Sequence, residues 1–152
     1  MGSIGVSTGD IRSSELGKAL EGSKLLLGRD AKTIVVFPNN VDNKMTDRAR
    51  GRYRGFAISM GNADTAQRDA FLTKLKGQAN VSARNADAAY NRAVQDAKNS
   101  GMSAREQRIV GEMARTAVQR RAIQAMLDKD KSGKYGGIKL RNLTNADYKR
   151  LK

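Results

Sequence analysis

The sequence contains no cysteine and no histidine, and these two absences exclude several classes of protein. Without cysteine there are no disulfide scaffolds, thiolate zinc sites, iron–sulfur clusters or cysteine nucleophiles. Without histidine there are no Ser-His-Asp triads, no histidine acid–base catalysis and no histidine-ligated metals. We therefore expect no cofactor and no metal, and we favour a binding function over an enzymatic one.

Large apolar residues are also scarce. Leu, Ile, Val and Phe make up 29 of the 152 residues, which is close to the composition at which a highly charged chain fails to build a core. The longest apolar runs, at 25–27 and 34–37, are too short to cross a membrane. The N-terminus has no basic-then-apolar signal sequence. We therefore expect a cytoplasmic protein with no membrane partner.

Positive charge is what the sequence has in excess, and it is unevenly placed. The chain carries 29 Lys and Arg against 15 Asp and Glu, a net charge of +14. Residues 1–43 are neutral, whereas 44–60 hold five basic residues against one acidic, and 102–152 hold thirteen against five. A charge concentrated in two regions points to a binding surface and not to a uniform solubilising coat.

The apolar pattern predicts a predominantly helical α+β fold. Residues 1–12 are expected to form a flexible arm, 13–127 a single domain, and 128–152 a basic C-terminal extension. Helical spacing predicts a first helix over 13–27. The β-branched run 33–37 and the segment 52–59 predict two strands that pair as a small antiparallel ribbon.

Three further helices are predicted after Gly61, and their alanine content favours close packing in a three-helix unit. The first begins at Asn62 or Asp64 and ends at Gly77, and the second runs from about Ser82 to Asn99. The third covers 103–127, because Ser103 and Glu106 have the spacing of a capping box. Its expected inward residues are Ile109, Val110, Met113, Ala117, Val118, Ile123 and Met126. A short strand is expected at 138–140.

An arginine ladder is the most distinctive motif. Arg48, Arg50, Arg52 and Arg54 alternate with small or aromatic residues. In an extended chain their guanidinium groups would lie on one side, roughly 6.5–7 Å apart, and guanidinium forks suit phosphate contacts. Tyr53 would point to the other side, where an aromatic ring packs or stacks on a base. The competing interpretation is a charged edge strand that prevents aggregation.

A second basic cluster covers the third helix and the C-terminal extension. Its members predicted to contact nucleic acid are Arg115, Arg120, Arg121, Lys129, Lys131, Lys134, Lys139 and Arg141. Cations near a helix C-terminus also complement the helix dipole, which is the competing interpretation for some of them. The excess of positive charge as a whole favours a surface that binds phosphates, with an affinity that falls as the salt concentration rises.

The loop at 128–139 resembles half of an EF-hand. Asp128, Asp130, Ser132 and Gly133 match four loop positions, but Lys139 stands where a bidentate glutamate is required. We therefore interpret the segment as a turn and not as a calcium site.

These patterns predict non-catalytic binding of DNA, RNA or another polyanion. One alternative is a structural or assembly protein, such as a virion or nucleoprotein component, which folds against a partner and joins an oligomer or larger assembly. Its basic surface would meet an acidic protein surface or a packaged genome. The other is a metal-independent ribonuclease toxin domain, whose first candidate residues are Asp47, Arg48, Arg52, Tyr53 and Arg54.

Overall fold

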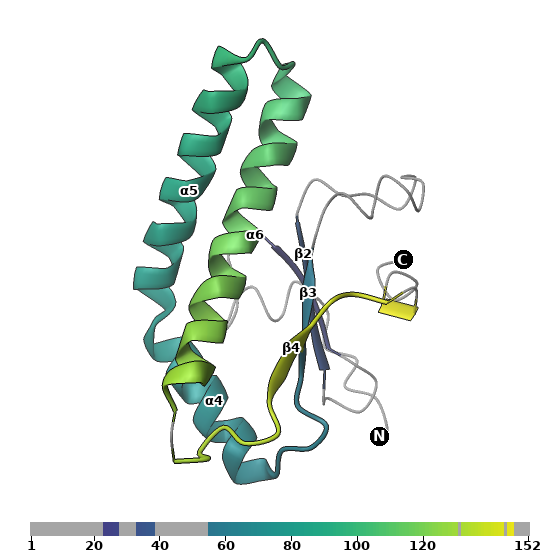
Figure 1. Ribbon diagram of the computed structural model, residues 1–152, viewed down its shortest axis with the longest axis vertical. Coiled ribbons are helices and arrows are strands. Elements are labelled where there is room, and N and C mark those ends of the chain that lie inside the picture. Colours follow the sequence, from purple (N-terminus) through teal and green to yellow (C-terminus); the bar gives the residue numbers. More distant parts are fainter. Residues whose placement is uncertain (1–22, 28–32, 39–54, 131, 145, 148–152) are drawn as a thin grey trace.

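An antiparallel sheet forms one layer of the protein. The computed structural model describes residues 23–27, 33–38, 55–130, 132–144 and 146–147 (Figure 1). Its four-stranded sheet has the order β1-β2-β3-β4, and every neighbouring pair is antiparallel. The strands are β1 (Ser23–Leu27), β2 (Thr33–Pro38), β3 (Phe56–Ser59) and β4 (Lys139–Arg141).

The predicted antiparallel ribbon is confirmed as the centre of this sheet. β2 pairs with β3 so that Ile34 lies opposite Ile58 and Val36 opposite Phe56, and all four side chains are buried. Their β-branched and aromatic side chains suit a pleated, packed surface. Of the predicted strand 52–59, residues 52–54 lie outside the described residues, and the strand begins at Phe56.

The helix predicted over 13–27 is wrong for its last five residues. Ser23–Leu27 is strand β1, whose register places Leu25 opposite Val36 and Leu27 opposite Ile34. The antiparallel register with β2 spans all five residues of β1, and that tertiary context overrides a helical spacing already weakened by Gly17 and Gly22. The rest of the predicted helix, 13–22, lies outside the described residues.

The short strand expected at 138–140 is present, shifted by one residue. β4 pairs with the other side of β3, with Leu140 opposite Ile58. β4 is therefore part of the sheet, although its residues were predicted to belong to the basic extension 128–152. The turn into it requires Gly137, whose φ is +82° and whose added Cβ would lie 2.5 Å from the backbone of Asn62.

The three predicted helices are confirmed as α4 (Thr65–Gly77), α5 (Ala79–Asn99) and α6 (Ala104–Lys129). Asp64 caps α4, and its carboxylate accepts a hydrogen bond from Gln67 N at 2.8 Å. The capping box predicted for α6 is also present, since Ser103 and Glu106 each satisfy a backbone N–H of the other. α5 begins three residues earlier than expected, after an N-cap Gln78 whose side chain makes no capping hydrogen bond.

The helices are arranged as a hairpin and one shorter helix, not as a closed bundle. α5 and α6 form a long antiparallel hairpin, α6 lies between α5 and the sheet, and α4 lies at the foot of the hairpin (Figure 1). The core combines sheet residues with Phe71 and Leu75 of α4 and with Ile123 and Met126 of α6. The predominantly helical α+β class is confirmed.

The inward face of α6 is more polar than its apolar spacing predicts. Ile123 and Met126 are buried as expected, whereas Ile109, Val110, Met113, Ala117 and Val118 are half-buried. The other buried residues of α6 are Gly111, Glu112, Thr116 and Gln119. α6 contacts both α5 and the sheet, so two of its faces are covered, and on the α5 side Gly111 lies directly against Tyr90 and Val94.

Candidate polyanion-binding site

The arginine ladder lies outside the described residues. These residues are Arg48, Arg50, Arg52, Tyr53 and Arg54. Lys131 of the second cluster is outside them as well. Their proposed phosphate contacts therefore stay a prediction.

Arg115 is engaged inside the hairpin. Its guanidinium forms an ion pair with Asp87 of α5, and its Nε lies 3.4 Å from Glu112 Oε2. The group also lies 4.6 Å from the centre of the Tyr90 ring, and the side chain is only 12% exposed. Burial raises the pKa of Glu112, while the positive charge of Arg115 counteracts part of that rise. Arg115 thus joins α5 to α6.

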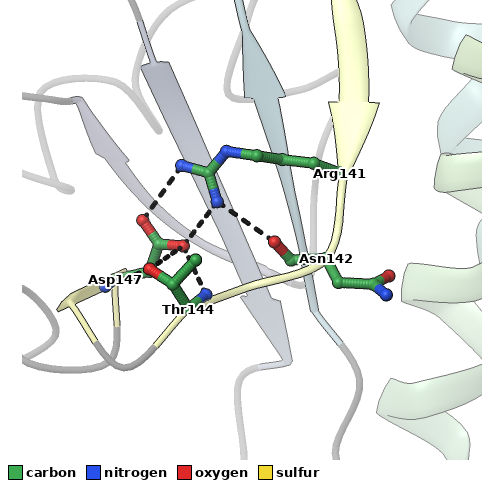
Figure 2. A network of polar contacts seen from close by, with 4 residues as sticks. All are labelled: Arg141, Asn142, Thr144 and Asp147. Atoms are coloured by element: carbon green, nitrogen blue, oxygen red, sulfur yellow. Dashed lines mark hydrogen bonds and ion pairs between the residues drawn. The ribbon is translucent and has the colours of Figure 1, made fainter.

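Arg141 is engaged at the end of β4 (Figure 2). Its Nη1 and Nη2 donate to the two carboxylate oxygens of Asp147 at 2.7 and 3.2 Å. Thr144 donates to the same carboxylate from its backbone N at 2.7 Å and from its hydroxyl at 3.1 Å. Burial raises the pKa of Asp147, but these donors outweigh it and hold the pKa below its ordinary value. The pair fixes the chain that follows β4.

The remaining predicted cations occupy several separate places. Arg120 is half-buried, with its guanidinium carbon 5.9 Å from the centre of the Phe56 ring. Lys134 is exposed beside Tyr135, and Lys139 is exposed on β4. Arg121 and Lys129 differ from these, because each lines a hollow on the helical hairpin.

Two adjoining hollows form what we call the α5–α6 groove. The upper hollow has a volume of about 530 Å³ and is lined by Asn85, Ala88, Ala89, Arg92, Val118, Arg121 and Ala122. The lower hollow has a volume of about 380 Å³ and is lined by Lys74, Gln78, Ala122, Ala125, Met126, Lys129, Asp130 and Tyr135. Ala122 lines both, so the hollows adjoin at this residue: the upper one lies between α5 and α6, and the lower one lies between the C-terminal ends of α4 and α6 and the loop that follows α6.

Arg121 lies on the side of α6 that faces away from the sheet. Ile123 of α6 lies in the core against the sheet. Arg121 precedes it by two residues, and two residues of an α-helix turn through about 200°, so Arg121 lies on the opposite side. Part of the groove is lined by Ala88, Ala89, Ala122 and Ala125, and their small side chains leave the helix backbones close to any ligand that enters.

Four cations surround this groove, two beside each hollow. They are Arg92 and Arg121 at the upper hollow and Lys74 and Lys129 at the lower one. All four are exposed, and none forms an ion pair with another described residue. Their charges are therefore available to an anionic ligand.

Among the residues lining the two hollows, the one acid is Asp130, and the loop already uses it. Its carboxylate accepts from Ser132 Oγ at 2.6 Å, Ser132 N at 3.2 Å and Tyr135 N at 3.1 Å. These hydrogen bonds lower the pKa of Asp130. The loop resembling an EF-hand is thus a turn built on Asp130, and within the described part of the chain no cluster of three acidic side chains is placed to hold a metal.

Arg92 and Lys74 are not among the cations predicted from the sequence to bind nucleic acid. Both lie in helices of low net charge, outside the two regions where positive charge is concentrated. The available signal was spatial: Arg92 follows Ala88 by one helical turn, and alanine beside arginine on one helix face leaves an open, basic surface.

Comparison with protein-family models, with curated proteins and with solved structures finds no match to this chain. Over the described residues, no helix has the length and apolar character needed to span a membrane.

Proposed function

We propose that this protein binds nucleic acid without catalysis, by contacting phosphates along the α5–α6 groove. The observation that carries the proposal is the set of four exposed cations around one groove, none of them neutralised by another described residue. By contrast, Arg115 and Arg141 are already paired with carboxylates.

The chemistry of the groove suits a phosphodiester backbone. A guanidinium presents a planar fork of donors that matches phosphate oxygens, which favours Arg92 and Arg121 as the orienting contacts. Lys74 and Lys129 add compact charges with freely rotating donors. Three of the seven residues that line the upper hollow are alanines, which have no side-chain donors or acceptors, so contacts there would depend on phosphates more than on base sequence.

The number of cations fixes the expected salt dependence. Each phosphate contact releases condensed counter-ions, so log K falls against log salt with a slope of about −0.7 per contact on single strands and about −0.9 on duplexes. Four contacts therefore give a slope of about −3 to −4. The arginine ladder at 48–54 would steepen this slope further.

Binding to random-sequence RNA and DNA over a salt series tests the proposal. The key variant is Arg92→Gln/Arg121→Gln, and the matched control is Lys98→Gln/Arg108→Gln, which removes the same charge from exposed positions of α5 and α6 outside the groove. We expect the groove variant to lose about two contacts, a slope change of about 1.4–1.8, and the control to lose much less.

Two results would contradict the proposal. Equal losses in the groove variant and in its control would mean that overall charge, and not the groove, attracts nucleic acid. A wild-type affinity that does not change with salt would exclude phosphate binding altogether. A separate variant, Arg48/Arg50/Arg52/Arg54→Ala, measures the contribution of the ladder.

A further inference from the structure

The lower hollow differs in chemistry from the rest of the groove. The upper hollow is lined by alanine, valine, asparagine and arginine, whereas the lower one adds an aromatic ring, a thioether, a free amide and two amines. Its volume of about 380 Å³ lies within the range of small-molecule sites, about 300–1,000 Å³.

Its apolar wall is held in a fixed position. The Tyr135 ring packs edge-on against the core residue Phe71, with the ring centres 6.1 Å apart and an interplanar angle of 78°. The backbone N of Tyr135 also donates to Asp130. Met126 is buried beside it. A half-buried tyrosine and a buried methionine together offer a firm, polarisable surface to a flat ring.

Three of its polar groups, on Gln78, Lys74 and Lys129, are free to contact a ligand, whereas the carboxylate of Asp130 is held by Ser132 and Tyr135. The Gln78 side chain makes no capping hydrogen bond with α5, and an amide carries both a donor and an acceptor, as the edge of a nucleobase requires. Lys74 and Lys129 are exposed and form no ion pair among the described residues. The two amines suit a phosphate, the amide suits the hydrogen-bonding edge of a base, and the aromatic wall suits the face of that base.

We propose that the lower hollow receives one unpaired nucleotide, with its phosphate at Lys74 and Lys129 and its base between Gln78 and Tyr135. This inference rests on the proposed function and gives it a substrate class, because a base in a duplex is stacked and its pairing edge is occupied. The protein therefore binds single strands more tightly than duplexes of equal length.

The ligand can be changed while the protein is left intact. We compare an oligothymidylate strand, the same strand with abasic sites, and a duplex of equal length. Base stacking on an aromatic side chain contributes enough that the abasic strand should bind wild type on the order of tenfold more weakly. The duplex of equal length should bind more weakly than the single strand although it carries more phosphates.

Two variants separate the phosphate from the base. Gln78→Ala leaves the charge unchanged, so it should reduce the difference between the intact and abasic strands without altering the salt slope. Lys74→Gln/Lys129→Gln should weaken both strands and reduce the slope by about 1.4. The control Lys76→Gln/Lys139→Gln removes equal charge from exposed positions that do not line the hollow and should retain the base preference.

The outcomes distinguish this inference from the proposed function. If the intact and abasic strands bind equally well and remain sensitive to Arg92→Gln/Arg121→Gln, the groove binds phosphates but the nucleotide pocket is refuted. If they bind equally and both require Lys74 and Lys129, the hollow holds phosphate alone, which also overturns the inference. If no strand binds wild type, the proposed function itself fails.

Discussion

Replacing Asp147 by asparagine should destabilise the protein although the two side chains have nearly the same shape. The carboxylate of Asp147 is 3% exposed and accepts from both terminal nitrogens of Arg141 and from Thr144. An asparagine can keep one acceptor oxygen, but its NH₂ then faces a donor of Arg141. A hydrogen bond to a charged group contributes about 1.5–3 kcal/mol.

The expected loss lies toward the lower end of that range. The Arg141 side chain is 37% exposed, so water screens part of its attraction to Asp147. We expect Asp147→Asn to lower the free energy of unfolding by about 2 kcal/mol at pH 7. For a domain of this length, that corresponds to a Tm lower by about 4–8 °C.

The same contact predicts a pH dependence with a definite sign. The folded state lowers the pKa of Asp147 from its ordinary value of 3.8, so its stabilisation is fully present above that value and is lost as the pH falls through the lowered pKa. Asparagine does not titrate. The stability difference between wild type and Asp147→Asn should therefore be constant from pH 7 to pH 5 and smaller by up to about 1 kcal/mol at pH 3.

Denaturant unfolding of both proteins at pH 7, 5 and 3 measures this difference. Other carboxylates with lowered pKa values, such as Glu106 and Asp130, are common to both proteins and cancel. An Asp147→Asn protein as stable as wild type at pH 7 would refute the reasoning. A difference that grows toward pH 3 would also refute it.

Three further substitutions test how the fold positions the groove. Gly111→Ala places a Cβ 2.6 Å from the Tyr90 ring. Overpacking costs about 1–3 kcal/mol, whereas the gain in helix propensity is about 1 kcal/mol, so thermal unfolding should show a net loss of stability. A variant more stable than wild type would contradict this. Gly137→Ala should lower the free energy of unfolding clearly more than Gly133→Ala. Both glycines have a positive φ, but of the two only Gly137 has backbone atoms within 4 Å of an added Cβ, and backbone cannot give way. Equal losses in parallel denaturant titrations would contradict this packing argument. Arg115→Gln should lower the free energy of unfolding by about 2–4 kcal/mol, because it leaves buried Glu112 without its charge partner. RNA affinity measured well below the Tm should not change. Weaker binding by a variant shown to be folded would instead place Arg115 at the RNA interface.

The sequence predicts most of the helical part of this fold because its signals are local. Capping residues such as Ser103, turn glycines and the spacing of alanines act within a few residues of where they stand. The β-branched strand at 33–37 is recognisable for the same reason. Strand β1 is not, because its conformation depends on pairing with β2, and a run of leucines satisfies helix and strand equally well.

The sequence predicts a basic binding surface, but it does not predict which cations line the groove. The excess of positive charge indicates an anion-binding surface, and Arg121 and Lys129 do line the groove. The spacing of Glu112 and Arg115 on one helix indicates a local ion pair, which is present. The sequence cannot show the pairing of Arg115 with Asp87 or of Arg141 with Asp147, because these partners lie on another helix or after a turn. The number of charged residues predicts that the surface is positive, but only the packing of the folded chain determines which cations are not paired with a carboxylate.

An NMR titration of amide shifts with a short single-stranded oligonucleotide tests the central claim most directly. The account predicts the largest shift changes along 85–92 of α5 and 118–129 of α6, with Lys98 and Arg108 near the hairpin tip affected little. Changes concentrated at the tip of the hairpin or along β4, with the groove residues unmoved, would contradict it.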